Sequence, residues 1–426
     1  MRRTLTSSLV AAGAATVAGL APGLADAAPA APAPPVETVL QWNAFLLGLQ
    51  ADPGVQPATV HPTYELALLH TAIYDAVVSI EQGKPAYLPP VTVKRPASPG
   101  AAADAAARET LTRLYPGQRP AIDAQYSALI AQVTNPHRRA EGVRIGRAAA
   151  DELLAARAGD RSNTSPFEYH PTAAPGSYQL TPPAFAAPAF TQWSVVKPFV
   201  LQRAAQFRPP APPPVTSPEY AAALNDVKAL GDAQSTSRTP EQTEIARFWN
   251  PPIWATWNAI GEHAALAAHS SLSENAHTFA ALDLTLADTA IAMYDGKYTL
   301  RWWRPVTAIR AADTDGNPDT TGDPNWTPLT NTAPDPSYPG AHATISAAAS
   351  DVLTRIYGAR LTFSLGSSAL PGVTRTFAGF AQAAREASDS RIFNGNHTRI
   401  DEAAGEQLGH SVATFVLAHG LRRPRG

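Results

Sequence analysis

A proline-rich stretch from about Pro171 to Pro218, which includes the run PPAPPP, is the strongest constraint on what this chain can fold into. Proline has no amide N–H and a fixed φ angle, so neither a helix nor a strand persists through such a stretch. Regular structure must therefore lie on either side of it. We interpret the stretch as an extended wrap over the surface of one compact domain, with a linker between two domains as the alternative.

On both sides of this stretch, apolar residues recur at the spacing of an amphipathic helix. Thr239 and Gln242 form the pattern of a capping box, with Pro240 at the first helical position. Few segments alternate with period two, so the chain is predicted to be all-α. The predicted helices cover residues 62–80, 101–114, 120–133, 138–159, 217–233, 239–249, 274–303, 342–357 and 397–419.

The first residues have the pattern of an export signal. Arg2 and Arg3 precede an apolar run from Leu9 to Leu20, and the small residues of the sequence ADA end at Ala27. This pattern predicts a cleaved signal peptide over residues 1–27 and a secreted protein. We divide the rest into an N-terminal helical region, residues 28–218, and a C-terminal helical region, residues 219–426.

Composition excludes several classes of function. The net charge of −2 gives no electrostatic reason to expect a nucleic-acid partner. The absence of cysteine excludes disulfides, cysteine nucleophiles and thiolate metal sites. Beyond the signal peptide, no stretch is apolar enough to predict a membrane anchor. Any anion site must therefore be a local cluster of positive charge.

Two cations occur in the sequence KYTLRWWRP. Lys297 and Arg304 are seven positions apart, which would place both on one face of a helix. Pro305 disfavours helical backbone at the residue before it, so Arg304 is expected at the helix end. The two cations would repel each other unless an anion or a carboxylate lies between them. The alternative is an exposed basic face that also includes Arg301.

Two histidines stand where helices are predicted to begin. In SYPGAH, Gly340 precedes His342 at the mouth of an alanine-rich helix, where free amides favour an anion and a histidine can act as acid or base. In SRIFNGNHTRID, Arg391 precedes His397, and Asp401 follows one turn later to orient the imidazole ring. The plainer alternatives are a histidine that only caps its helix and a solvated helix start.

These three segments resemble the signature of the acid phosphatase and vanadium haloperoxidase superfamily. That signature reads Lys-x6-Arg-Pro, then Pro-Ser-Gly-His, then Ser-Arg-x5-His-x3-Asp. The segments LLHTAIYDAV and DGKYTLRWWRPVTAIR also look like the bacterial vanadium-dependent haloperoxidase branch. The middle part departs from the pattern, with Gly340 and Ala341 in place of serine and glycine. The first and third parts match at Lys297, Arg304, Pro305, Ser390, Arg391, His397 and Asp401.

The resemblance implies an all-α helix bundle and a vanadate cofactor bound through His397, a site that phosphate can also occupy. In that role the oxyanion's oxygens would contact Lys297, Arg304, Arg391, Gly340 and Ala341. His342 would serve as acid and base, and Lys297 would polarise peroxide. A halide would then attack the peroxide and leave as a hypohalous acid equivalent, with a small organic acceptor as the further partner. The missing serine hydroxyl would weaken oxyanion binding by roughly 1.5–3 kcal/mol.

Two other functions remain open at this point. An acid phosphatase would use His397 as nucleophile, Asp401 to orient it and His342 to protonate the leaving alcohol. A degenerate site would bind an oxyanion without turnover. The sequence does not indicate the oligomeric state. Four tryptophans are candidates for a halide or organic-substrate pocket, although core packing is the expected role of each: Trp254, Trp257, Trp302 and Trp303.

Overall fold

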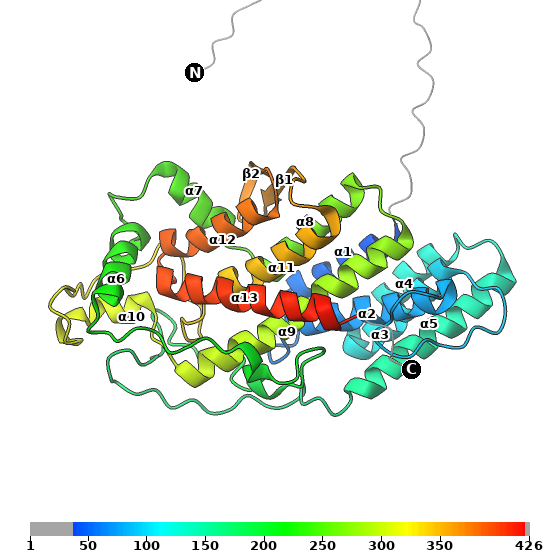
Figure 1. Cartoon of the computed structure of the whole chain (residues 1–426), viewed down its shortest axis with the longest axis horizontal. Coiled ribbons are helices and arrows are strands. Elements are labelled where there is room, and N and C mark those ends of the chain that lie inside the picture. The colour runs from blue at the N-terminus through cyan, green and yellow to red at the C-terminus, as the bar shows by residue number, and fades with distance from the viewer. Residues whose placement is uncertain (1–36, 422–426) are drawn as a thin grey trace, which may run out of the picture. The chain divides into compact units, whose positions relative to one another are not determined.

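The computed structural model describes residues 37–421, which contain 13 α-helices and one two-stranded antiparallel sheet. The predicted all-α helix bundle is confirmed (Figure 1). The predicted signal peptide, residues 1–27, lies outside the described residues, so export stays a prediction.

The described elements have the following bounds: α1 Thr38–Ala51, α2 Pro62–Glu81, α3 Pro99–Leu114, α4 Arg119–Ile130, α5 Pro136–Arg157, α6 Pro218–Gly231, α7 Pro240–Phe248, α8 Ile253–Ala267, α9 Leu272–Leu300, α10 Pro305–Arg310, α11 Ala341–Tyr357, β1 Phe363–Ser367, β2 Leu370–Phe377, α12 Phe380–Phe393 and α13 Arg399–His419.

Helical spacing located most of these elements correctly. The capping box at Thr239 is present, because its hydroxyl accepts from the Gln242 amide while the Gln242 side chain accepts from the Thr239 amide. The predicted helix over residues 274–303 is wrong at its C-terminal end, because α9 stops at Leu300 and Arg301 adopts a left-handed φ of 50°. Four helices were not predicted: α1, α8, α10 and α12.

The central element is α9, which is buried along nearly its whole length. It begins with a capping box between Ser271 and Glu274, and alanine, leucine and threonine then face all sides. A helix that is apolar all round must be enclosed by other elements. Helix α9 packs against α2 and also against α11 and α13, and these helices surround it in Figure 1. The residues at its C-terminal end are therefore held deep in the bundle.

The proline-rich stretch runs beside α9 without forming an α-helix or a strand in this described segment. Its regular structure is limited to the 3-10 turns Trp193–Val195 and Ala204–Phe207. The carboxylate of Asp288, on α9, accepts the amides of Phe199, Val200 and Leu201 at 2.6, 2.8 and 2.7 Å. One buried side chain thus fastens the stretch to the central helix. The division into regions 28–218 and 219–426 stays a prediction.

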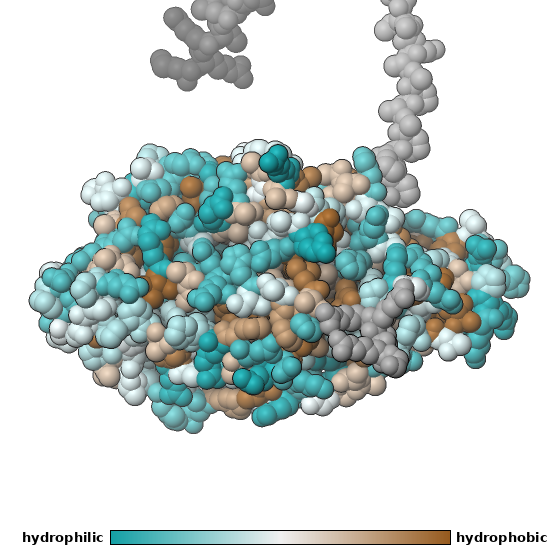
Figure 2. Space-filling view, viewed as in Figure 1, coloured by the Kyte–Doolittle hydropathy of each residue, from teal (hydrophilic) through white to brown (hydrophobic). Residues whose placement is uncertain are grey.

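One face of the molecule is polar for the most part. Figure 2 shows a face of mainly hydrophilic and neutral residues, with apolar residues in smaller patches between them. No helix within residues 37–421 combines the length and apolar character that crossing a bilayer requires.

We expect Asp288→Ala to lower the free energy of unfolding by about 3–5 kcal/mol, because several amides lose their acceptor in a buried setting. Urea unfolding followed by circular dichroism measures the loss, and limited proteolysis near residue 200 should become faster. Asp226→Ala is the matched control, since it removes a partly exposed ion pair with Arg399 and should cost about 0–1 kcal/mol. Equal losses in both variants would contradict the role of Asp288.

Candidate functional site

Lys297 and Arg304 are brought together by a carboxylate rather than by a shared helix face. Lys297 lies near the end of α9, whereas Arg304 is the extended N-cap of α10. Both side chains reach Asp335, which forms an ion pair with Arg304 and lies 3.7 Å from the Lys297 ammonium. The prediction of one helix face is therefore wrong, although the predicted proximity and the need for a carboxylate between the cations are correct.

The loop that carries Asp335 also holds the Lys297 ammonium through backbone carbonyls. The carbonyls of Pro336 and Ser337 both accept hydrogen bonds from it, the second at 3.3 Å. Burial lowers the pKa of Lys297 to about 8, with the Asp335 charge opposing the shift. Burial alone would raise the pKa of Asp335, but the charges of Lys297 and Arg304 outweigh it and hold that pKa below its usual value. Asp335 and Lys297 therefore favour each other's charged form, whereas the charge of Arg304 opposes that of Lys297.

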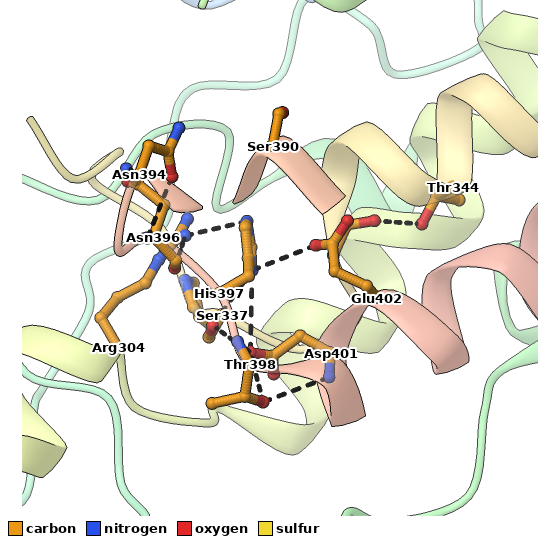
Figure 3. Close-up of polar contacts among 12 residues, drawn as sticks. Arg304, Ser337, Thr344, Ser390, Asn394, Asn396, His397, Thr398, Asp401 and Glu402 are labelled. Atoms are coloured by element: carbon orange, nitrogen blue, oxygen red, sulfur yellow. Dashed lines mark hydrogen bonds and ion pairs between the residues drawn. The ribbon is translucent and has the colours of Figure 1, made fainter. Parts of the chain in front are cut away.

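His397 lies beside this cluster, between Arg304 on one side and Glu402 on the other (Figure 3). Arg304 Nη1 lies 3.1 Å from His397 Nε2. On the opposite edge of the ring, Ser337 Oγ lies 3.1 Å from His397 Nδ1 and donates to Asp401 Oδ2 at 2.8 Å. Asp401 itself is 3.8 Å from the ring, so it orients His397 through Ser337 and not by the direct hydrogen bond that the i+4 spacing suggested.

These contacts determine which nitrogen of His397 carries the proton. Ser337 donates its hydroxyl proton to Asp401, so its oxygen must accept from Nδ1–H. The other nitrogen, Nε2, then presents a lone pair. Burial lowers the pKa of His397 well below its usual value, and the charges of Arg304 and Lys297 lower it further, so the ring is neutral. That lone pair accepts from Arg304 Nη1, so a ligand bound at Nε2 would replace this contact. A neutral imidazole of this kind can act as a ligand or as a nucleophile.

Arg391 supplies positive charge without a matching hydrogen-bond partner. It lies near the end of α12 with 6% of its surface exposed. Within the described residues, its buried Nε and Nη1 atoms have no hydrogen-bond partner. Burial lowers the pKa of Arg391 to about 10, which leaves the guanidinium charged at neutral pH. Orphaned buried donors of this kind are uncommon in proteins and indicate an absent acceptor.

His342 lies in the first turn of α11, where the sequence placed it. Its Nε2 donates to the Trp249 carbonyl at 2.9 Å, because a carbonyl can only accept. Burial and the positive charge of Arg391 hold the pKa of His342 well below its usual value. The neutral ring therefore keeps Nδ1 as a lone-pair nitrogen, which is suited to take up a proton.

Gly340 and Ala341 differ in what their amides can bind. The Gly340 amide donates to the Asp401 carbonyl at 2.8 Å, so an oxyanion would have to compete for it. The Ala341 amide, at the first position of α11, has no backbone partner within residues 37–421. The Ala341 amide is therefore available to an oxyanion, whereas the Gly340 amide already donates to Asp401.

The space where a serine side chain would begin at position 340 is filled by Glu402. A Cβ atom added to Gly340 would lie 2.0 Å from Glu402 Oε1 and 2.8 Å from its carboxyl carbon. Glu402 is 4% exposed, and neither of its carboxyl oxygens has a hydrogen-bond partner at standard geometry. Burial raises its pKa to about 8, with the charge of Arg391 opposing the shift. Burial therefore favours the protonated form of Glu402, whereas the charge of Arg391 favours the ionised form.

The structure thus assembles every predicted site residue around one cluster and adds Asp335, Ser337 and Glu402, which were not predicted. Asp335 and Ser337 lie in the loop just before Gly340, and Glu402 follows Asp401 directly. The only sign of these three residues in the sequence was that they carry a charge or a hydroxyl group and lie close to the motif residues. The four candidate tryptophans instead belong to or flank the apolar clusters, as the core alternative predicts: Trp254, Trp257, Trp302 and Trp303.

Taken together, these groups fit a small multivalent oxyanion such as vanadate or phosphate. The cations outnumber the carboxylates that pair with them, since Asp335 is shared by Lys297 and Arg304 while Arg391 keeps two donors free. The His397 lone pair lies at the same cluster. Fixed charges and donors in a water-poor cavity bind such an anion without reorganising.

We expect Gly340→Ser to lower the free energy of unfolding by about 1–3 kcal/mol, because its Cβ overlaps the Glu402 carboxyl. Gly340→Ala is the matched control and should cost about the same, since the overlap comes from Cβ and not from the hydroxyl. The double variant Gly340→Ser/Glu402→Ala should regain at least about 1 kcal/mol over the sum of the single changes. Additive effects in urea unfolding would show that Glu402 moves aside freely.

A second prediction concerns His61, which is buried among the rings of Phe190, Trp254 and Tyr294. Burial lowers its pKa to about 3, and the charge of Asp335 opposes the shift. The unfolded chain protonates this histidine near its ordinary value, whereas the folded chain does not. The stabilising contribution is therefore complete above pH ~6.5 and is lost as the pH falls toward ~3, by up to about 1.4 kcal/mol per pH unit.

His61→Asn removes this titration and keeps an acceptor for the Thr63 amide. The difference in unfolding free energy between the two proteins should shrink by about 2 kcal/mol from pH 6.5 to 4.5. His410→Asn gives a control of opposite sign, because Asp351 raises the pKa of His410. A difference that does not change with pH would show that water reaches the His61 ring.

Known proteins share this sequence pattern and this fold. Residues 277–426 match the family model of the VCPO second helical-bundle domain. The vanadium chloroperoxidase of Curvularia inaequalis is 32% identical over 174 residues, which cover 34% of this chain and 28% of that protein. The match thus spans little more than a quarter of that relative's length.

Solved structures extend the similarity to nearly the whole chain. The first bacterial vanadium-dependent iodoperoxidase superposes with a TM-score of 0.75 at 25% identity, over 91% of this chain and 97% of its own. Holo and apo bacterial vanadium-dependent chloroperoxidases superpose at 0.65 and 0.68 with 18% and 16% identity, over 87% and 88% of this chain and 95% and 98% of theirs. These last two show the fold alone. The sequence match over residues 277–426 and the superposition on the iodoperoxidase together make this chain similar to the vanadium haloperoxidases.

Proposed function

We propose that this protein oxidises halide ions with hydrogen peroxide, using vanadate held at the cluster around His397. The observation that carries the proposal is the pair of free Arg391 donors beside a neutral histidine whose unprotonated Nε2 faces the cation cluster. The relatives named above are vanadium haloperoxidases, which supports the same chemistry here. Vanadate would supply a Lewis-acidic centre that activates hydrogen peroxide toward attack by a halide.

The residues of this chain would divide the work of binding. His397 would bond the central atom, because its Nε2 faces the cation cluster while Ser337 holds the opposite edge of the ring. Arg304 and Arg391 would neutralise the oxygens as charged donors. Lys297 would act chiefly through its charge, since carbonyls and Asp335 already surround its ammonium. The Ala341 amide adds a neutral donor.

His342 would handle the proton that hydrogen peroxide gives up. Its Nδ1 atom is unprotonated because Nε2 donates to Trp249 and the ring is neutral. A base of this kind accelerates proton transfer by roughly 10²–10⁴-fold when it is correctly placed. Nearby bound negative charge raises the proton affinity of an imidazole, so the ring can later return the proton.

The same geometry gives a phosphatase fewer advantages. His397 could attack a phosphoryl group, but the leaving alcohol would then need a proton from His342. The lowered pKa of His342 leaves its protonated form scarce before an anion binds. Proton uptake from peroxide suits the neutral ring better than proton donation to an alcohol does. We therefore place halide oxidation first and phosphate-ester hydrolysis second.

We expect the purified protein to retain one vanadate per chain through gel filtration and His397→Ala to retain none, because the variant lacks the imidazole whose unprotonated Nε2 faces the cation cluster. Metal analysis of the protein fraction measures retention, and circular dichroism checks that the variant is folded. His410→Ala, a surface change next to Asp351, is the matched control and should retain vanadate fully. Retention by His397→Ala would move the ligand to another residue.

The activity is then measured on the same preparations. Bromination of monochlorodimedone with hydrogen peroxide should depend on added vanadate and should be suppressed by phosphate, since both anions need the same donors. Hydrolysis of p-nitrophenyl phosphate without bromination would reverse the order of the two functions. Retained vanadate with neither activity would favour the degenerate oxyanion-binding site.

A further inference from the structure

An arginine of the β1–β2 hairpin, Arg375 of β2, joins the hairpin to α7 and α12, which lie beside it in Figure 1. Its Nε and Nη2 atoms donate to the two carboxyl oxygens of Glu386, on α12, at 2.7 and 2.9 Å. Glu241 and Glu244 of α7 accept from the same guanidinium, but their side chains are 63% and 39% exposed, against 15% for Glu386. The two-pronged pair with Glu386 is therefore the one that water and salt weaken least.

Glu386 also holds the side chain of a buried tryptophan. The indole Nε1 of Trp249 donates to Glu386 Oε1 at 3.0 Å, which is the same oxygen that accepts from Arg375 Nε. Trp249 is the C-cap of α7 and is 1% exposed. Its ring packs against those of Phe248 and Phe377, with centroids 5.7 and 5.8 Å away. The position of the Trp249 backbone is thus fixed by the end of α7 and by the contacts of its own ring.

The backbone carbonyl of Trp249 is the group that accepts from His342 Nε2, at 2.9 Å. The hydrogen bond that one ring nitrogen of a histidine makes determines which nitrogen carries the proton. This carbonyl therefore keeps the proton on Nε2 and leaves Nδ1 as the base. A continuous chain of hydrogen bonds runs from the hairpin, through α12 and the end of α7, to His342.

We propose that Arg375 and Glu386 are positioning residues of the reaction, which act through Trp249 to set the tautomer and the position of the His342 ring. The proposal rests on the role of His342 in the proposed function. A bidentate arginine–carboxylate pair has a defined geometry, so it presents the Glu386 oxygen to the indole in one place. A pair that only stabilised the fold would lower the stability when broken and would leave the tautomer of His342 unchanged.

The sharpest change is Trp249→Phe, because it removes the indole N–H and keeps the backbone carbonyl, an aromatic ring and the pair between Arg375 and Glu386. Changes to that pair could also move α12, which carries Arg391. The tautomer of His342 is read from 15N NMR spectra of the vanadate-free protein after selective labelling of histidine, with His342→Asn to assign the signals. We expect the Nε2–H tautomer in the unchanged protein, and the Nδ1–H tautomer in about a tenth or more of the Trp249→Phe molecules.

Trp42→Phe is the matched control, since the Trp42 indole also donates to a buried carboxylate, that of Asp104, at 3.1 Å. This pair joins α1 to α3, so its loss should lower the stability to urea and leave the His342 signals unchanged. Glu386→Gln keeps an acceptor for the indole and should retain the Nε2–H tautomer, whereas Glu386→Ala should behave as Trp249→Phe does. His342 signals that stay unchanged in both Trp249→Phe and Glu386→Ala would overturn the proposal.

Turnover separates this positioning role from the proposed function. With vanadate, peroxide and bromide present, Trp249→Phe should lower kcat at least about 10-fold relative to Trp42→Phe, because His342 moves a proton. The two variants should retain vanadate equally. Normal kcat in Trp249→Phe despite a changed tautomer would overturn the positioning role and leave the proposed function intact. A tautomer change together with no halide oxidation by the unchanged protein would overturn the proposed function and leave the control of the His342 ring intact.

Discussion

The buried carboxylate of Asp335 is the interaction on which the site depends. Lys297 and Arg304 are almost fully buried, and isolated buried cations are far less stable than solvated ones. Asp335 pairs with both, so the end of α9 and the start of α10 can meet inside the bundle. Arg304 then reaches His397 from this fixed position. Loss of that one carboxylate would leave two neighbouring cations without a counter-charge.

The loop after Asp335 connects this ion-pair cluster to His397. Ser337 uses its carbonyl to hold Lys297 and its hydroxyl to join His397 to Asp401. One short segment therefore fixes a cation, the tautomer of the ring and the start of α13. Positive charge that no carboxylate balances is concentrated at Arg391, whose free donors point to an anion as the missing partner. Lys297 and Arg304 are thus paired with Asp335, whereas Arg391 keeps donors that a ligand can use.

The sequence predicted correctly those elements whose position follows from the helical spacing of apolar residues. Helices such as α2, α9 and α11 follow from apolar spacing, and capping residues located the start of α7. The closeness of Lys297 and Arg304 was predicted for the wrong reason, because α9 ends at the left-handed Arg301 between them and Arg304 caps a new helix that begins at Pro305. Asp335 and Ser337 were missed since they act from a loop, where no periodicity links a side chain to its partner. Helix α12 was missed as well, although it carries Arg391.

The departure at Gly340 shows why a motif position cannot be judged alone. A serine there would supply a hydroxyl donor, and its absence by itself predicts weaker oxyanion binding. In this chain the same volume holds the carboxyl of Glu402, and burial raises the pKa of that carboxyl and so favours its protonated form. A protonated carboxyl is a hydrogen-bond donor, as a hydroxyl is. Because Gly340 has no side chain, the Glu402 carboxyl can lie close to Arg391 and His397. Positions 340 and 402 therefore form one structural unit, although one lies at the start of α11 and the other in α13.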